Sequence, residues 1–473
     1  MQPPKFVSKS KLMRYAAPAG PAVADTVAGE LRATLAVALP LAGAQLAQVM
    51  MGFTAWAMMG RLGGDALAAG GLGSSLAFTV MLVCQGVLTA VGPLAAHALG
   101  AREGERVAAT VGNGLVIAAA LSLFGMGVVA LIPLGLAAIG HAPPLVAATE
   151  RYTGAVLWGM PAALGYAVLR SYLAATGRTL PLMVTLFLCL GLNIALNYAL
   201  IFGHLGAPAL GIAGAGYANA AIQWVQFAIL ALTVVVRHGG RDIFIAMCRP
   251  QSAEIAAVLR LGLPIAGIFA LESGMFTSAA ILAGLLGTAA LAAHQVGSGI
   301  GSIGFMVPLA FGHAATVRVA LSKGAGAIGA ARRAGIVAFA CGVGFMGAMA
   351  LFILTEPRVI IGLYLDRGDP ANAAAIAIAV RLLFVSALFQ IFDGAQVVAA
   401  GALRGLRDTA VPMLIAGIGY WAVGFASAWA LAFPLGLGAV GLWWGLPAGL
   451  AAVAIPLAWR FLRLTLHPRA LLA

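Results

Sequence analysis

The sequence has few charged residues, and this scarcity excludes most classes of soluble protein. Only 9% of the residues are Asp, Glu, Lys or Arg, whereas 62% are hydrophobic. Soluble globular domains carry about 25% charged and about 45–50% apolar residues. The mean hydropathy of +1.02 therefore indicates a chain that spends most of its 473 residues in a membrane.

The chain also lacks the motifs of several enzyme classes. It contains no P-loop, no nucleophile elbow, no metalloprotease helix and no Cys-x-x-Cys pair. Its four cysteines show no spacing typical of a disulfide framework or a metal site. These absences argue against an enzyme, against a resident cofactor and against ATP-driven pumping by this chain alone.

What the sequence does contain is long hydrophobic runs, which predict an all-α membrane protein with twelve transmembrane helices. A helix needs about 20 apolar residues to cross a bilayer. The predicted spans are 34–58, 68–93, 107–133, 145–169, 180–203, 210–236, 255–283, 290–317, 334–355, 376–402, 409–433 and 438–459.

The net charge of +13 is distributed as a topology signal rather than as a nucleic-acid-binding patch. With the N-terminus inside, 22 of the 27 Lys and Arg lie in the inner segments. Cytoplasmic loops are enriched in these residues. We therefore expect both termini in the cytoplasm of a bacterial cell, a multi-pass location in its inner membrane, and lipid but no nucleic acid as a partner.

The chain repeats itself at a spacing of 224 residues. Pro40 matches Pro264, Gly63 matches Gly287, and the register continues to Ala101 without a gap. Each half has an even number of spans, so the two halves are parallel repeats, an arrangement known in transporters that bind substrate near the membrane midplane. The predicted organisation is a cytoplasmic tail (1–33), an N-terminal six-helix lobe (34–236), a cytoplasmic linker (237–254), a C-terminal six-helix lobe (255–459) and a second tail (460–473).

Two of the 14 acidic residues fall in the middle of predicted spans, where a charged side chain is costly. Glu272 lies in the seventh span, eight residues after Pro264, and Asp393 lies in the tenth. A carboxyl group at this depth persists when it faces a cavity, is protonated or binds a cation. Both are predicted to couple transport to Na⁺ or H⁺; the alternative is a neutral carboxyl that hydrogen bonds to a neighbouring helix.

The first half offers neutral polar groups in place of acids. Gln48 is the repeat partner of Glu272, with Gln45 one turn before it, and Asn193 and Asn197 lie in the fifth span. Amide side chains both donate and accept hydrogen bonds. These four are predicted to line a substrate cleft, with hydrogen bonding between helices as the equal alternative for each.

Several blocks of the sequence are similar to a known family. They are Met51-Gly-Phe to Met59-Gly60; Leu192-Asn-Ile-Ala-Leu-Asn197; Gly262-Leu-Pro-Ile with Glu272; Ala292-Ala-His-Gln-Val296; and Asp393-Gly-Ala-Gln-Val-Val-Ala-Ala-Gly401 followed by Leu403-Arg-Gly-Leu-Arg-Asp408. With these blocks the chain resembles the multidrug and toxic compound extrusion (MATE) family, in its NorM-like branch. The resemblance runs from Pro40 to the last span.

That resemblance implies a two-lobe exporter driven by inward Na⁺ or H⁺. It places Glu272 and Asp393 at the cation-site positions of the C-terminal lobe, and Asn193 and Asn197 at polar positions of the N-terminal lobe. One position departs from the family pattern, because Ala55 stands where an Asp is usual. Coupling through an N-lobe carboxylate is therefore disfavoured. Na⁺ is preferred to H⁺ at the remaining site, since hard oxygen ligands suit hard cations.

The function expected from these features is secondary active efflux of small organic compounds, cationic ones in particular, by a monomer. One alternative is a flippase for lipid-linked saccharides, which would be expected to line its cleft with several cations that the spans here lack. A channel is a second alternative and would conduct without coupling. An intramembrane enzyme would need a paired nucleophile and base, which the sequence does not offer.

Overall fold

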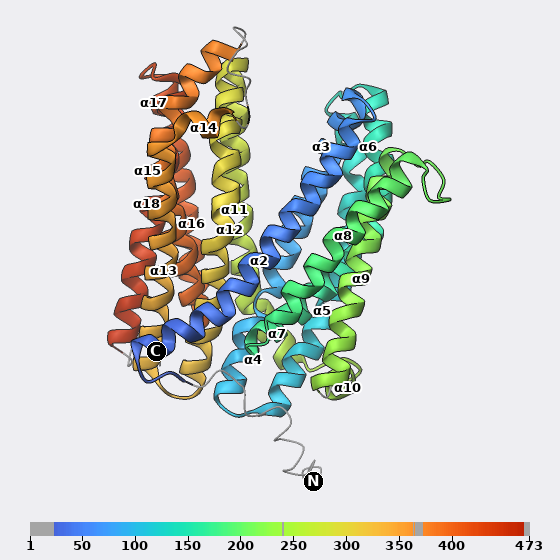
Figure 1. The fold of residues 1–473 in the computed structure, drawn as a ribbon. Coiled ribbons are helices and arrows are strands. Elements are labelled where there is room, and N and C mark those ends of the chain that lie inside the picture. Colours follow the sequence, from blue (N-terminus) through green and yellow to red (C-terminus); the bar gives the residue numbers. More distant parts are fainter. Residues whose placement is uncertain (1–22, 239–240, 363, 365–371, 468–473) are drawn as a thin grey trace. The chain divides into compact units, whose positions relative to one another are not determined.

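The computed structural model describes residues 23–238, 241–362, 364 and 372–467. Every regular element in this part of the chain is a helix (Figure 1). Twelve helical segments within it are long and apolar enough to cross a membrane. Each overlaps one predicted span, so the prediction of an all-α membrane protein with twelve helices is confirmed.

Most helices extend beyond the apolar stretch that predicted them. Helix α2 (Val27–Gly60) begins inside the predicted tail 1–33, and α18 (Gly438–Leu466) continues past residue 459. The predicted linker contains a short helix, α10 (Arg241–Met247). Hydropathy marks only the part of a helix that needs lipid, so polar helix ends escape it. The remaining tail residues, 1–22 and 468–473, lie outside the described part.

The chain packs as two compact units. Among the described residues, unit 1 comprises Gly43–Ala266 and unit 2 comprises Val23–Ala42 together with 267–467. The boundaries fall inside α2 and α11 (Ser252–Leu285), two residues after Pro40 and Pro264. The two boundaries are themselves 224 residues apart, as the repeat requires. The first segment of each repeat, however, packs in the unit that contains the rest of the other repeat.

Unit 1 is built around α5 and α9. Helix α9 packs against α6, α7 and α8, and α5 packs against α3, α4 and α7. A Cβ atom added at Gly159 would lie 2.8 Å from the Cα atom of Ala220, so glycine permits this close approach to α9. The elements are α3 (Gly64–Leu88), α4 (Val91–Gly100), α5 (Gly104–Ala138), α6 (Pro143–Val156), η1 (Leu157–Gly159), α7 (Met160–Ala175), α8 (Leu180–Phe202) and α9 (Ile212–His238).

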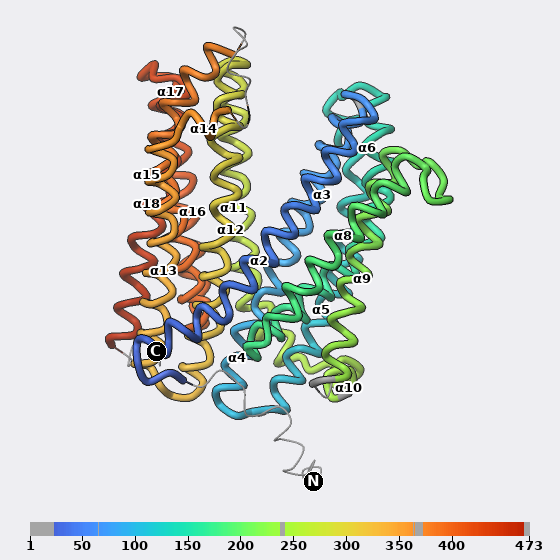
Figure 2. Tube along the Cα trace, viewed as in Figure 1, coloured from blue at the N-terminus to red at the C-terminus, as the bar shows by residue number. Residues whose placement is uncertain are grey.

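Unit 2 is built around α15 (Ala373–Gly405), which packs lengthwise against α12, α13 and α18 (Figure 2). A Cβ atom added at Gly401 of α15 would lie 2.2 Å from the carbonyl oxygen of Gly312 of α12, so α15 and α12 contact each other through glycine backbone. The other elements are α12 (Thr288–Gly324), α13 (Ile328–Thr355), α14 (Pro357–Gly362), α16 (Ala410–Gly417), the π-helix η3 (Ile418–Phe425) and α17 (Ala426–Ala432).

The backbone repeats together with the sequence. Gly63 and Gly287 precede α3 and α12 with φ angles of 116° and 110°, a region that glycine enters without a Cβ penalty. Arg102 and Gly326, also 224 residues apart, have φ angles of 61° and 75° and follow the ends of α4 and α12. Matched turns between matched helices support the two parallel halves.

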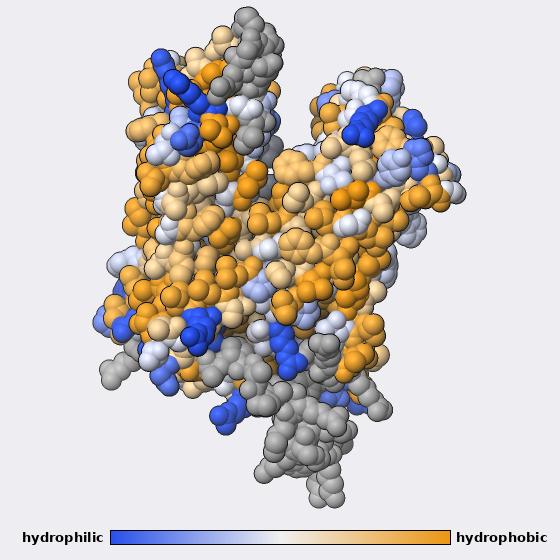
Figure 3. All heavy atoms as spheres, in the orientation of Figure 1, coloured by the Kyte–Doolittle hydropathy of each residue, from blue (hydrophilic) through white to orange (hydrophobic). Residues whose placement is uncertain are grey.

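Large apolar side chains are exposed along the middle of both units (Figure 3). Leu123 and Phe124 in unit 1 are 74% and 64% exposed, and Ile281 and Phe384 in unit 2 are 61% and 63% exposed. Hydrophilic side chains gather toward the helix ends on the face shown. Only a hydrocarbon environment suits apolar surface of this extent.

Candidate functional site

The structure brings the two mid-span acids together at one amide in unit 2. The Nε2 atom of Gln396 lies 2.9 Å from Oε1 of Glu272, to which it donates, and 3.5 Å from Oδ1 of Asp393. Glu272 comes from α11, and Asp393 and Gln396 come from α15. Two carboxyl groups 121 positions apart in the chain thus share a single donor group.

The other end of the amide is held by a tyrosine. The hydroxyl of Tyr420 donates to Oε1 of Gln396 over 2.7 Å. Tyr420 lies in η3, and π-helical turns of this kind are frequent at functional sites. Asp393, Gln396 and Tyr420 are 4%, 2% and 0% exposed, whereas Glu272 is half-buried. Glu272 is therefore the member of the site with access to its surroundings.

Helix geometry explains why α15 supplies two of these groups. Residues three apart lie on the same face of an α-helix, so Asp393 and Gln396 point together toward α11. Glu272 follows Pro264 by two turns in α11. A proline inside a helix removes one backbone hydrogen bond and permits a bend, which gives this segment of α11 some freedom to move.

Arg404 brings a cation close to Glu272. The guanidinium of Arg404 stacks over the ring of Phe269 at 5.3 Å, one turn from Glu272 in α11, and interacts electrostatically with that carboxyl group. Arg404 is 4% exposed. With both carboxyl groups ionised, the two carboxylates and the guanidinium would carry one net negative charge in a buried place, and unpaired buried charge is costly. A single monovalent cation would neutralise it.

The four polar residues predicted to line a cleft belong to unit 1, whereas the acid cluster belongs to unit 2. Asn193 and Asn197 are 3% and 1% exposed on α8, and Nδ2 of Asn197 donates to the backbone oxygen of Asn193 over 2.9 Å. Their Oδ1 atoms have no hydrogen-bond partner among the described residues. Gln45 and Gln48 are half-buried on α2. Asn193 and Asn197 thus place neutral acceptors in the interior of unit 1.

Ala55 is half-buried in the part of α2 that belongs to unit 1, so this turn of α2 carries a methyl group and no carboxylate.

Sequence reasoning missed three members of the site: Gln396, Tyr420 and Arg404. Gln396 had a signal, since it follows Asp393 by three positions within the motif Asp393-Gly-Ala-Gln. Arg404 lies in the last turn of α15. In the sequence it looks like one of the basic residues that commonly flank a membrane helix on the cytoplasmic side. Tyr420 had no signal, because a tyrosine in an apolar run is usual and its partner lies on another helix.

Comparison with known proteins places the chain in a family. The MatE family model matches residues 40–199 and 264–430. The Multidrug resistance protein NorM of Burkholderia vietnamiensis is 43% identical over 434 residues, covering 90% of this chain and 93% of its own. The Probable multidrug resistance protein NorM of Burkholderia pseudomallei (strain K96243) is 42% identical, covering 91% and 92%.

A solved structure shares the fold. A multidrug resistance MATE family transporter of the MOP superfamily superposes with a TM-score of 0.83 at 19% identity, covering 93% of this chain and 96% of that one. The resemblance predicted from the motifs is thereby confirmed. This chain belongs to the MatE family of membrane transporters.

Proposed function

We propose that this chain is a secondary active multidrug efflux antiporter that exchanges small organic compounds for Na⁺. The observation that carries the proposal is the convergence of Glu272 and Asp393 on the amide of Gln396, with the Arg404 guanidinium close to Glu272. The relatives from Burkholderia are named multidrug resistance proteins, which supports drugs as the exported cargo.

The ligand chemistry supports Na⁺ as the coupling ion. Carboxylate, amide and hydroxyl oxygens are hard donors, and hard cations prefer them. Glu272, Asp393 and Tyr420 supply such oxygens within reach of one amide. A proton would neutralise the same charge. H⁺ therefore competes with Na⁺ for these oxygens and does not need a second site.

The exported compounds are proposed to be small organic cations. Cation cargo and Na⁺ can exclude one another through the same net negative charge, which gives antiport without direct contact between them. The neutral amides of unit 1, Asn193, Asn197, Gln45 and Gln48, suit hydrogen bonding to varied cargo because each can donate or accept. The protein is proposed to act as a monomer in the bacterial inner membrane with both termini in the cytoplasm.

The test is uptake of a cationic dye into proteoliposomes under imposed ion gradients. We expect an imposed Na⁺ gradient to drive dye movement against its own gradient, and the Glu272→Gln variant to abolish this at unchanged reconstitution. Dye flux that only follows its own gradient would indicate a channel. Movement of a lipid-linked saccharide across the bilayer, without dye transport, would indicate a flippase.

A further inference from the structure

Helix α15 carries a line of buried polar side chains that leads from the acid pair toward its N-terminal end. Asp393 is preceded by Gln390 at three positions and by Ser386 at seven, so all three share one face of the helix. Ser386 and Gln390 are both 0% exposed. Neither takes part in the hydrogen bonds of the acid pair.

The hydroxyl oxygen of Ser386 and both polar atoms of the Gln390 amide lack a hydrogen-bond partner among the described residues. A buried polar group left unpaired costs about 1–3 kcal/mol. Native proteins satisfy such groups with internal water or a ligand, so three unpaired atoms on consecutive turns point to a hydrated place.

The neighbouring helix presents glycines to the amide of Gln390. Gly301 and Gly304 of α12 face Gln390, and a Cβ atom added to them would lie 3.8 Å from its Nε2 atom and 3.4 Å from its Oε1 atom. Two glycines one turn apart thus keep methyl groups away from the polar end of Gln390. Larger apolar side chains at these two positions would press against the amide and enclose it in hydrocarbon.

The line continues toward α12 and α18. His294 and Trp443 are 3% and 1% exposed, with ring centroids 5.7 Å apart, and Trp443 lies 6.0 Å from the ring of Phe389, next to Gln390. Atom Nδ1 of His294 and atom Nε1 of Trp443 also lack partners in the described chain. Together with those of Ser386 and Gln390, five polar atoms on α12, α15 and α18 thus lack a partner among the described residues.

We propose that Ser386 and Gln390 line a hydrated approach through unit 2 along which the coupling cation reaches Asp393. The proposal rests on the function proposed above, in which Asp393 and Glu272 bind that cation. The Ser386 hydroxyl and the Gln390 amide oxygen can replace water ligands of Na⁺, while the amide Nε2 holds water beside it. Gln390 is a positioning residue for hydration, one turn before the acid.

The first experiment measures whether water reaches this face of α15. Ser386→Cys is compared with Val385→Cys in a background where the four native cysteines are replaced by Ala. Val385 is the matched control, because it is 1% exposed on the adjacent, apolar position at the same depth. A small hydrophilic thiosulfonate is added to reconstituted protein, and labelling is followed by mass spectrometry.

We expect Ser386→Cys to react at least about tenfold faster than Val385→Cys, since a thiol in apolar surroundings stays protonated and inert. Added Na⁺ should slow the labelling. Equal slow rates at both positions would overturn the proposal. The proposed function would then still stand if unmodified protein shows Na⁺-driven efflux, so the two failures are distinguishable.

A second pair of variants tests Gln390 itself. Gln390→Leu should raise the Na⁺ concentration for half-maximal efflux and slow the labelling of Ser386→Cys. Gln226→Leu is the matched control, because Gln226 is a buried glutamine of unit 1 that also has an unpaired amide oxygen. Equal effects of the two leucine variants on half-maximal Na⁺ would overturn the role of Gln390. Rapid labelling of Ser386→Cys without any ion-driven efflux would overturn the link between the hydrated approach and cation coupling.

Discussion

Arg318 and Glu30 form a bidentate ion pair with no exposed side-chain surface. Atoms Nε and Nη2 of Arg318 each donate to one carboxylate oxygen of Glu30 over 2.7 Å. The pair ties the start of α2 to α12 within unit 2, and Thr34 donates to the same carboxylate. Its repeat counterpart, Glu254, accepts from Arg106 and Thr110 within unit 1. Each repeat thus begins with an anchored glutamate.

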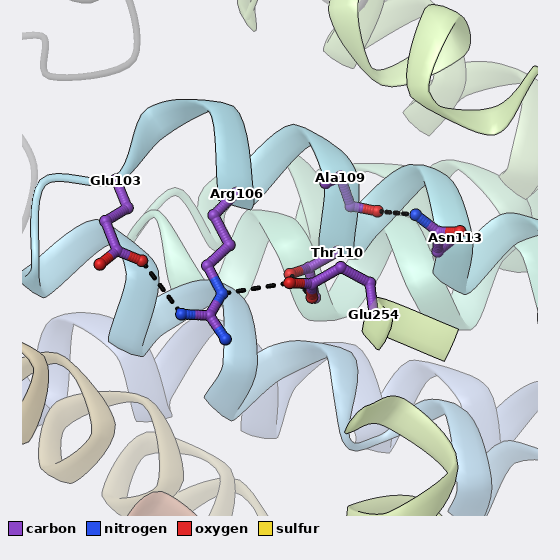
Figure 4. A network of polar contacts seen from close by, with 6 residues as sticks. All are labelled: Glu103, Arg106, Ala109, Thr110, Asn113 and Glu254. Atoms are coloured by element: carbon purple, nitrogen blue, oxygen red, sulfur yellow. Dashed lines mark hydrogen bonds and ion pairs between the residues drawn. The ribbon is translucent and has the colours of Figure 1, made fainter. Parts of the chain in front are cut away.

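The two anchors should differ in their contribution to stability. Removing one partner of a buried ion pair costs about 3–5 kcal/mol, whereas an exposed pair contributes about 0–1 kcal/mol. We expect Arg318→Met to lower the free energy of unfolding by an amount in the first range, and Arg106→Ala by one in the second. Arg106 is 42% exposed between Glu103 and Glu254 (Figure 4). Unfolding of detergent-solubilised protein by denaturant measures both.

A double variant separates charge burial from packing. Arg318→Met combined with Glu30→Leu removes both charges, and such replacements are often neutral. Stability should return toward that of the unmodified protein. A double variant as unstable as Arg318→Met would show that the pair's geometry, rather than an unpaired charge, holds α2 in unit 2.

The acid pair should behave as one site. Glu272→Gln and Asp393→Asn keep the shape of each side chain and remove its charge, so the cation loses its attraction. Each variant should abolish coupled efflux at normal expression, and the double variant should be little worse, because groups that act as a unit are non-additive. Gln48→Ala should be milder, within about tenfold for one neutral hydrogen bond. Normal efflux by Glu272→Gln together with failure of Gln48→Ala would move the site to unit 1.

The amide that joins the acids should set cation affinity. Tyr420→Phe removes one hydrogen bond to Gln396, worth about 0.5–1.5 kcal/mol, so half-maximal Na⁺ should change by no more than about tenfold. Gln396→Leu leaves both acids and the tyrosine without their partner and should have the larger effect. Tyr166→Phe is the control, since that buried hydroxyl has no partner in the described chain. Efflux titrated against Na⁺ gives the comparison.

The choice of ion has a direct measurement. We expect dye efflux to follow an imposed Na⁺ gradient at constant pH. Lowering the pH on both sides should weaken Na⁺ dependence, because protons compete for the same carboxylate oxygens. Efflux that ignores Na⁺ and follows a pH gradient would assign H⁺ instead.

The membrane topology can be read with reporter fusions. Fusions at Lys323, at the end of α12, and at the C-terminus should report the cytoplasm, and a fusion at Glu356, after α13, should report the outside. The reason is the excess of Lys and Arg on the inner segments. A C-terminal fusion outside the cytoplasm would contradict the inferred orientation.

The class of fold and the two mid-membrane acids could be predicted from the sequence alone. Apolar runs specify membrane helices because unpaired backbone groups are not tolerated in lipid, so hydropathy located all twelve spans. The repeat predicted that Gly63 and Gly287 begin equivalent helices, since matched residues favour matched turns. Glu272 and Asp393 could be identified because charge at mid-membrane depth is costly wherever the chain folds.

Which side chains contact the two acids depends on how the helices pack, and the sequence did not predict it. Gln396 and Tyr420 join the acid pair through contacts between α11, α15 and η3, and no local pattern encodes which helices pack together. The division of α2 and α11 between the two units likewise depends on contacts such as that of Glu30 with Arg318, 288 residues away. A helix forms through hydrogen bonds and burial that depend on residues close together in the sequence. The partners of a buried polar atom instead depend on packing between helices that are far apart in the sequence.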